Sequence, residues 1–459
     1  MVAPLPSSAL RSLRSLVGDA HVVDDPEVLA GHVVDWTGTY IGSSPALVRP
    51  GTVEEVAEVV RWARSHRVAL VPQGGGTGLV GGGVPLAGEV LLSTSRLVGV
   101  EDVDPDAGQL TALAGTTLAA VQAAAIGAGW RYGVDLAARD SATIGGTVAT
   151  NAGGLRVLRH GTTRRQLLGL EAVLGTGEVV SRLGGLVKDN TGYDLAGLVC
   201  GSEGTLGIVT RVRLALVPAP GPTVTALVGL DSVADAVSLV GRLRREVPTL
   251  EAAEVVLAAG AELVAARTGA APVLDPTPPV QLVVEAVGPP DPADALAAAL
   301  GSSPAVGQVA VATDPARATG LWHVREAHTE AIAGLGSVHK YDVTVPGRAL
   351  ADFVADVPAL VRAVAPGADV WIFGHLGDGN LHVNVTGVEA AVGEGDPIAD
   401  AVLGRVVAAG GSISAEHGIG TAKRAWLARD RSPGDVAAMR AIKDALDPDG
   451  ILNPNVLLP

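Results

Sequence analysis

The stretch QGGGTGLVGGGVP, residues 73–85, decides the fold of this chain. It places seven glycines between positions 74 and 83, directly after the apolar run VALVP at 68–72, which predicts a buried strand. Glycine lets backbone N–H groups approach an anion closely and adopts positive φ angles at little cost. A strand followed by such a loop indicates a site for a cofactor that carries a pyrophosphate.

This loop does not fit a nucleotide-binding turn of the Rossmann type. Residues Gly76 to Gly81 match GxGxxG, which is a weak signal by itself. A Rossmann turn must open a helix, whereas Gly82, Gly83 and Pro85 follow here and are poor helix formers. The GK[S/T] of a P-loop is also missing from the loop. An NAD-dependent Rossmann enzyme is therefore a poor interpretation.

Two further glycine-rich blocks lie in the same half of the chain. They read ATIGGTVATNAGG at 142–154 and GSEGTLGIVT at 201–210. One such loop could be a flexible surface segment, but three blocks tied to strand-like runs favour a binding site. A capping-box pattern at Thr52 and Glu55 begins a predicted helix over 52–66. The proline-rich run near 217–222 marks a domain boundary.

Composition narrows the class of protein. The 459 residues are 48% hydrophobic and 18% charged, with a net charge of −15, which argues against nucleic acid or an anionic membrane as the main partner. The single cysteine, Cys200, excludes a disulfide framework, a cysteine-ligated zinc site and an iron–sulfur cluster within the chain.

No apolar run reaches the roughly 20 residues of a transmembrane helix, and the N-terminus lacks a signal-peptide core. A cytoplasmic location is therefore expected.

The strongest chemical signal is WIFGHLGDGNLHVNV at 371–385. Asp378-Gly379 between apolar runs predicts a hairpin turn, which would set His375 directly opposite His382. Their Cβ atoms would then be about 5 Å apart, a suitable separation for holding one cation. Asn384 would face the same side.

The run GGSISAEHGIG at 410–420 offers a carboxylate and a third imidazole, at Glu416 and His417. A metal bound by two histidines and a carboxylate keeps coordination positions open for substrate. The metal could polarise an alcohol oxygen while the remaining histidine removes its proton.

A cationic pocket is a further candidate. Arg325 and Thr329 are spaced i, i+4 in a predicted helix over 316–334, and Lys340 lies in the predicted strand 337–346. Together these side chains could hold a substrate carboxylate. The plainer alternative is that Arg325 pairs with Glu330 or another acidic residue of the same helix.

The blocks PQGGGTGLVGG, DSATIGGTVATNAGG, GSEGTLGIVT, GHLGDGNLHVNV and SAEHGIG together resemble the FAD-dependent D-2-hydroxy-acid dehydrogenases. The resemblance runs in the same order from about residue 35 to the C-terminus. It implies an α+β fold of the vanillyl-alcohol-oxidase type, with a two-part FAD-binding domain, a ferredoxin-like α+β cap and a C-terminal helical segment. The expected domains are 1–218, 219–420, which carries the metal site, and 421–459, which returns to the FAD-binding domain.

The resemblance also implies roles for individual residues. The FAD contacts that it implies are Gly74, Gly75, Gly76, Thr77, Gly78, Ser141, Gly145, Gly146, Asn151, Gly154, Val209 and Asn453. The implied metal ligands are His375, His382 and Glu416, the implied catalytic base is His417, and the implied substrate contacts are Arg325, Thr329, Lys340 and Asn384. Relatives with covalent flavin carry a histidine in the first glycine loop, where this chain has Thr77, so noncovalent FAD is expected. The usual ending NPGK is replaced here by NPNV at 453–456, so the contact of its lysine is missing.

The implied reaction is oxidation of a small D-2-hydroxy acid, such as D-lactate, glycolate or D-2-hydroxyglutarate, to the 2-oxo acid. A divalent metal, zinc or manganese, assists deprotonation of the hydroxyl, and hydride passes to flavin N5. A quinone or an electron-transfer protein would reoxidise the flavin, and assembly as a homodimer stays open. Two alternatives stay open as well: a flavin transferase of the alkyl-dihydroxyacetone-phosphate synthase type, and a non-catalytic flavin subunit of a larger complex.

Overall fold

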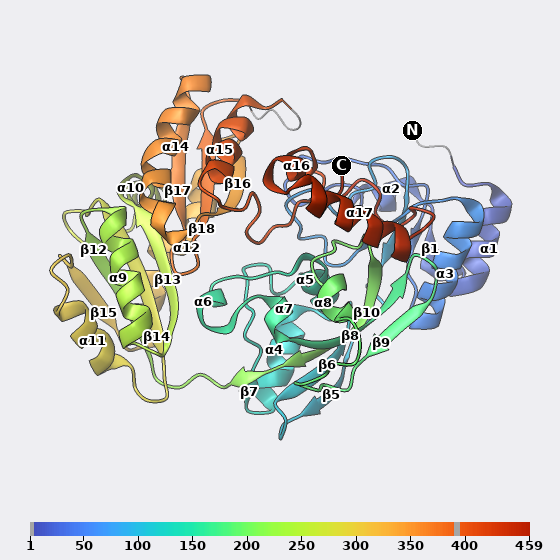
Figure 1. The fold of residues 1–459 in the computed structure, drawn as a ribbon, viewed down its shortest axis with the longest axis horizontal. Coiled ribbons are helices and arrows are strands. Elements are labelled where there is room, and N and C mark those ends of the chain that lie inside the picture. Colours follow the sequence, from blue (N-terminus) through green and yellow to red (C-terminus); the bar gives the residue numbers. More distant parts are fainter. Residues whose placement is uncertain (1–3, 390–394) are drawn as a thin grey trace. The chain divides into compact units, whose positions relative to one another are not determined.

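The computed structural model describes residues 4–389 and 395–459, which fold into two compact units (Figure 1). Unit 1 comprises Met1–Gly154, Gly161–Ala219 and Glu416–Pro459, and unit 2 comprises Leu155–His160 and Pro220–Ala415. The chain thus crosses to unit 2 near the proline-rich run at 217–222 and returns to unit 1 at Glu416. Within the described residues, no helix is both long and apolar enough to span a membrane.

The first sheet of unit 1 carries the glycine-rich loop. Its strands, in spatial order, are β1 (Val22–Val23), β2 (Leu47–Val48), β4 (Val90–Ser93) and β3 (Leu70–Gln73). Strands β2, β4 and β3 run parallel, and helices α1 (Ser7–Val17) and α3 (Val53–His66) contribute to the same apolar core. The predicted helix over 52–66 is confirmed, with the Thr52 side chain accepting the N–H of Glu55 as its cap.

The second sheet of unit 1 is antiparallel. Its strands, in spatial order, are β5 (Val100–Asp104), β6 (Gln109–Leu113), β10 (Gly207–Ala215), β8 (Leu167–Leu174) and β9 (Val179–Arg182). Helices α4 (Leu118–Gly127), α5 (Ile144–Thr150) and α8 (Leu195–Val199) bury their apolar side chains in its core. Short strands β7 (Trp130–Arg131) and β11 (Val217–Pro218) pair beside it.

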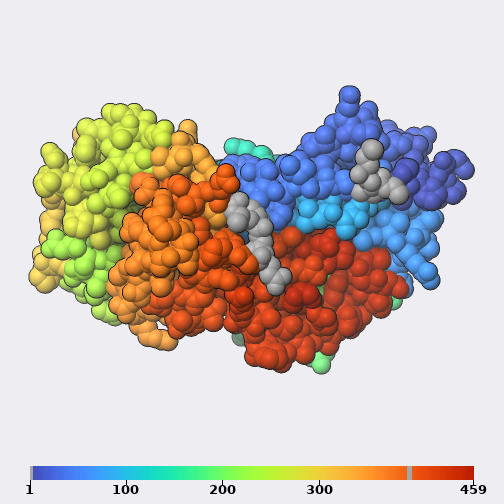
Figure 2. All heavy atoms as spheres, turned by 90° about the horizontal axis from the view of Figure 1, so that it is seen from above, coloured from blue at the N-terminus to red at the C-terminus, as the bar shows by residue number. Residues whose placement is uncertain are grey.

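The C-terminal residues pack within unit 1. They form α16 (Leu427–Asp430) and α17 (Pro433–Leu446), and the chain then runs alongside β3. The N–H of Leu70 donates to the carbonyl of Ile451 at 2.8 Å, and the N–H of Asn453 donates to the carbonyl of Leu70 at 2.8 Å. Figure 2 shows the red C-terminal residues directly beside the blue N-terminal ones. The end of the chain therefore reaches the strand that precedes the first glycine loop.

Unit 2 is built on one antiparallel sheet of seven strands. In spatial order these are β15 (Val309–Ala312), β12 (Thr223–Leu230), β14 (Val280–Val287), β13 (Leu250–Leu257), β17 (Asp369–His375), β18 (Asn380–Thr386) and β16 (His339–Thr344). Its helices are α6 (Val157–His160), α9 (Val233–Glu246), α10 (Ala258–Thr268), α11 (Ala293–Gly301), α12 (Pro315–Glu326), α13 (His328–Ala333), α14 (Leu350–Val364) and α15 (Pro397–Ala408). Both units are thus α+β, as the sequence predicts.

The predicted helix over 316–334 is wrong in one respect. The helix is interrupted at Ala327, so that α12 ends at Glu326 and a separate helix, α13, begins at His328. Beyond the break, His328 contacts Phe373 with tilted rings whose centroids are 4.9 Å apart, while Arg325 is buried and pairs with Glu254 on β13. Thr329 is exposed and no longer shares one continuous helix face with Arg325.

Candidate active site

The two histidines of the β17–β18 hairpin lie on one face of the sheet, in a different register from the predicted one. His375 is opposite Asn380, and His382 is opposite Phe373, so direct opposition of the histidines is wrong. The turn spans residues 376–379, closed by the N–H of Gly379 donating to the carbonyl of His375 at 3.1 Å. Since side chains alternate along a strand, the two imidazoles remain diagonal neighbours, with ring centroids 5.3 Å apart.

The longer turn has a physical cause outside the hairpin. Gly377 donates its N–H to the carbonyl of Ala253 on β13 at 3.1 Å, rather than pairing with β18. Leu376 beside it is buried in unit 2. Contacts with a neighbouring strand therefore override the two-residue turn that Asp378-Gly379 favours.

A buried carboxylate orients His375. Glu254 on β13 places Oε1 2.7 Å from Nδ1 of His375 and Oε2 2.9 Å from Nε of Arg325. Burial alone would raise the pKa of Glu254, but the charges and hydrogen bonds of His375 and Arg325 hold that pKa below its usual range. A carboxylate at Nδ1 fixes the tautomer of the imidazole and leaves Nε2 as the donor atom for a cation, as in many metal sites.

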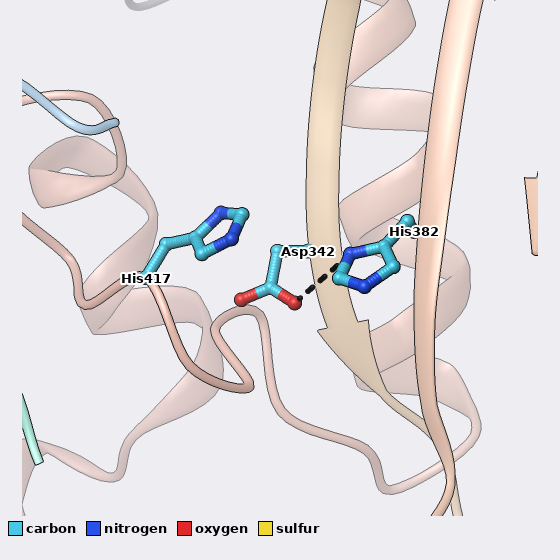
Figure 3. Close-up of side chains that lie close together, drawn as sticks. All are labelled: Asp342, His382 and His417. Atoms are coloured by element: carbon cyan, nitrogen blue, oxygen red, sulfur yellow. Dashed lines mark ion pairs between the residues drawn. The ribbon is translucent and has the colours of Figure 1, made fainter. Parts of the chain in front are cut away.

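A second carboxylate lies beside His382. Asp342 on β16 is opposite His382 in the sheet, with Oδ1 3.6 Å from Nδ1 of the imidazole (Figure 3). Asp342 is buried and accepts a hydrogen bond from Nδ2 of Asn380 at 2.7 Å. Asp342 is not among the residues predicted from the sequence, although it stands two positions after Lys340 and therefore on the same face of the strand.

The two candidate residues of the SAEHGIG run, Glu416 and His417, belong to unit 1. Oε1 of Glu416 accepts the N–H of Gly154 at 2.8 Å. His417 is linked to the unit 2 sheet through the chain itself. Ala415 donates its N–H to the carbonyl of Asp342 at 3.4 Å, and two residues span at most about 7 Å. Asp342, His382 and His417 offer one carboxylate and two imidazoles, a donor set that suits a divalent cation.

The proposed substrate residues of unit 2 surround the same face. Lys340 and Asn384 are opposite each other on β16 and β18, with Lys340 exposed and Asn384 buried. Nδ2 of Asn384 has no hydrogen-bond partner among the residues that the structure describes, which leaves a buried donor for a ligand. The guanidinium of Arg325 lies 4.6 Å from the centre of the Phe373 ring.

In unit 1 the first two glycine blocks meet backbone to backbone. A Cβ at Gly75 would lie 1.9 Å from the carbonyl oxygen of Ser141, and one at Gly74 would lie 2.4 Å from Oγ1 of Thr143. Beyond these contacts, Gly76 and Gly78 face open space and their backbone is exposed. The loop follows β3 without opening a helix, as predicted. Exposed N–H groups with no side chain over them fit the pyrophosphate of FAD.

The other flavin candidates lie in the same unit. Gly145 lies in the first turn of α5, Asn151 caps the end of this helix in the left-handed conformation, and Val209 is buried in β10. Gly146 lies in α5, and Gly154 packs so closely that a Cβ there would lie 2.0 Å from the carbonyl oxygen of Asp135. Asn453 donates through Nδ2 to the carbonyls of Gly82 and Glu203 at 2.9 and 2.8 Å. This asparagine thus joins the first and third glycine blocks.

Two family models match successive parts of the chain. Residues 44–182 match the family described as FAD binding domain, and residues 219–457 match FAD linked oxidases, C-terminal domain. The chain is 40% identical to a D-2-hydroxyglutarate dehydrogenase of Xanthomonas citri pv. viticola, over 97% of this chain and 96% of the relative. It is 39% identical to the mitochondrial D-2-hydroxyglutarate dehydrogenase of Bos taurus, over 95% and 81%.

Solved structures share the fold at much lower identity. An alkyldihydroxyacetonephosphate synthase matches with a TM-score of 0.75 and 18% identity, over 99% of this chain and 87% of the other. A p-cresol methylhydroxylase matches with a TM-score of 0.73 and 19% identity, over 98% and 96%. These likenesses show the vanillyl-alcohol-oxidase type of fold that the sequence analysis expects. The chain belongs to the FAD-linked oxidase family and is a flavin-dependent oxidoreductase.

Proposed function

We propose that this protein oxidises a D-2-hydroxy acid to the 2-oxo acid, with D-2-hydroxyglutarate as the first substrate to test. The observation that carries the proposal is the pair His375 and His382 on one sheet face, with a carboxylate next to each imidazole. The relatives at 39–40% identity named D-2-hydroxyglutarate dehydrogenase supply the substrate class.

The residues of unit 1 that fit FAD are the exposed loop Gly74 to Gly78 and the backbone of Ser141 against which it packs. Noncovalent binding is the expected mode, because Thr77 stands where covalent relatives carry a histidine. When bound, FAD would accept the hydride from C2 of the substrate, and a divalent cation would polarise the hydroxyl oxygen.

The proposed cation ligands are Nε2 of His375 and a ring nitrogen of His382, with zinc or manganese as the metal. Nitrogen and oxygen donors suit either ion. Two carboxylates compete for the remaining position: Glu416, which the resemblance implies, and Asp342, which lies 3.6 Å from His382. Glu254 would hold the His375 ring in the orientation that the cation needs.

The substrate carboxylates are proposed to bind Arg325 and Lys340, with Asn384 and Thr329 supplying hydrogen bonds. Arg325 uses only Nε in its ion pair with Glu254 among the described residues, so its two Nη groups are available for a carboxylate. His417 would take the hydroxyl proton as general base. Its place in the chain, two residues beyond the Asp342 contact of Ala415, supports that role.

The two alternatives predict different chemistry. A transferase of the same fold that performs no net oxidation would need no cation beside the flavin. A non-catalytic flavin subunit would have no use for His417 or the two hairpin histidines. Dependence of turnover on a bound metal therefore separates the proposed dehydrogenase from both.

The test measures metal content and turnover together. Treatment with a chelator should remove about one metal ion per chain and abolish turnover, while the visible flavin spectrum is unchanged. Asp342→Asn and Glu416→Gln are then compared for bound metal, with the exposed Glu262→Gln of unit 2 as the matched control. The carboxylate that ligates the ion is the one whose variant loses metal. Full turnover in the metal-free protein would overturn the proposal.

A further inference from the structure

A buried carboxylate of the third glycine block contacts the loop that carries His417. Glu203 is buried in unit 1. Its own φ angle is 53°, which lies in the left-handed region that non-glycine residues rarely adopt. Its Oε1 accepts the N–H of Ile419 at 2.8 Å, and its Oε2 accepts the N–H of Gly420 at 2.7 Å. One side chain thus holds two consecutive backbone amides of the SAEHGIG run.

The fit between this carboxylate and the loop is close on every side. A Cβ at Gly418 would lie 2.9 Å from Oε1 of Glu203, and Gly418 itself has a φ of 83°. A Cβ at Gly420 would lie 2.2 Å from the carbonyl oxygen of Val80. Because Gly418 and Gly420 lack side chains, the backbone on both sides of Ile419 can pack directly against Glu203 and Val80.

Glu203 itself is fixed by two backbone hydrogen bonds and by a nearby positive charge. Its N–H donates to the carbonyl of Ala149 at 2.8 Å, and its carbonyl accepts Nδ2 of Asn453 at 2.8 Å. The buried Lys423 supplies a nearby positive charge. A left-handed conformation at a non-glycine residue costs free energy and persists only where the surroundings fix it, often at functional sites.

We propose that Glu203 is a positioning residue: its carboxylate fixes residues 418–420, and through them sets the imidazole of the adjacent His417 for proton removal. The inference rests on the proposed role of His417 as the base. A general base must sit within hydrogen-bond distance of the proton that it removes, and a displacement of about 1 Å can lower the rate about 100-fold. Glu203 does not touch the reacting atoms in this account.

The first test is Glu203→Gln, which keeps the size of the side chain. Burial raises the pKa of Glu203, so the uncharged amide avoids a desolvation cost and the variant is expected to fold. The amide nitrogen cannot accept a hydrogen bond, however, so only one of the two backbone N–H groups keeps its partner. Hydrogen exchange of the 416–420 segment should accelerate, with bound FAD unchanged.

The kinetic consequence should appear in the chemical step. In anaerobic stopped-flow mixing at saturating D-2-hydroxyglutarate, flavin reduction by Glu203→Gln should slow about 100-fold, with little change in the substrate concentration for half-maximal rate. The control is Glu171→Gln. Glu171 is also a buried carboxylate of unit 1, but it pairs with Arg211 in the second sheet. A merely structural loss would lower the thermal stability of both variants without slowing reduction per bound flavin.

The decisive measurement is the rate of flavin reduction in a double variant that carries both Glu203→Gln and His417→Asn. If Glu203 acts through His417, the double variant should reduce its flavin no more slowly than His417→Asn alone, because the two effects share one group. Additive losses, or a wild-type rate of Glu203→Gln, would overturn the inference.

The outcomes separate this inference from the proposed function. Fast reduction by His417→Asn would contradict the base assignment, whereas hydrogen exchange would still report whether Glu203 fixes the loop. If Glu203→Gln does not fold, Gly418→Ala moves the loop from the opposite side of the same contact. It should then show the same fall in rate, and a wild-type rate would count against the inference.

Discussion

Glu254 shows how one residue can set the chemistry of a whole sheet face. Its carboxylate is almost completely buried and divides its two oxygens between His375 and Arg325, one a proposed metal ligand and the other a proposed substrate contact. Removing one member of a buried, hydrogen-bonded ion pair leaves the other charge without compensation. The residue therefore couples stability to function.

Glu254→Gln should consequently lower both the stability of the fold and the affinity for the metal. Loss of the buried charge is expected to lower the free energy of unfolding by about 3–5 kcal/mol, and loss of the carboxylate behind His375 should weaken metal binding about 10–100-fold. Urea unfolding and metal titration of the apoprotein measure the two effects. The exposed Glu262→Gln serves as the control. Unchanged metal affinity in Glu254→Gln would show that His375 is not oriented by this contact.

His328 gives a prediction about pH. Burial, followed by the positive charge of Arg325, lowers the pKa of His328 to about 4. The unfolded histidine has a pKa near 6.5, so between about pH 6.5 and 4 the unfolded state binds a proton that the folded state does not. Stability should therefore fall as the pH drops through this window, by up to about 1.4 kcal/mol per pH unit from this group.

Urea unfolding at pH 6.5 and pH 5 tests this prediction. The wild-type protein and the exposed-site variant His323→Gln should lose stability with the same slope. His328→Leu cannot titrate at this position and should show a shallower slope. An identical slope in His328→Leu would mean that His328 is not the group that unfolding protonates.

At this scale the sequence identifies some partners and not others. Asp342 could be predicted from strand alternation, because it shares the face of Lys340 two positions away. Glu254 could not, because it lies 121 residues before His375 and reaches it only through the pairing of β13 with β17. Which strands become neighbours is a property of the sheet, and local sequence does not contain it.

Elements were predicted well where their signals are local. The helix at 53–66, the strand at 70–73 and a hairpin between the two histidines follow from caps, apolar periodicity and turn residues. The errors arise from tertiary contacts. Gly377 bonds to β13 and lengthens the turn, and Ala327 breaks a helix with no glycine or proline near the break, so that His328 can reach Phe373.

The first glycine loop carries the clearest prediction for an element. Gly75→Ala would place a methyl group 1.9 Å from the Ser141 carbonyl oxygen, a backbone atom that cannot yield without moving the second block. FAD affinity should fall at least about tenfold, which corresponds to a loss of about 1.4 kcal/mol. Fluorescence titration of the apoprotein with FAD measures the change.

The matched control is Gly127→Ala at the end of α4. A Cβ there meets nothing within 4 Å, and the position is exposed in the same unit. This variant should bind FAD as tightly as the wild type. If Gly75→Ala also binds normally, the close packing of the two glycine blocks is not what shapes the cofactor site.

For the whole molecule, the chemistry is divided along the chain between two units. Unit 1 carries the glycine loops and the Glu203 contact with residues 418–420, and unit 2 carries the histidine hairpin. The resemblance of five motifs was enough to predict the family and the α+β class. It did not predict that the short segment 155–160 packs with unit 2, where Arg156, Arg159 and His160 all contact the buried Glu251.

The most direct test of the account is anaerobic reduction of the flavin by pure enantiomers of 2-hydroxy acids. We expect D-2-hydroxyglutarate to bleach the flavin absorbance and the L-enantiomer to leave it unchanged. Chelation and His417→Asn should each suppress bleaching without altering the spectrum of the oxidised flavin. Flavin that stays oxidised with every D-2-hydroxy acid, or a protein that remains colourless after reconstitution with FAD, would contradict it.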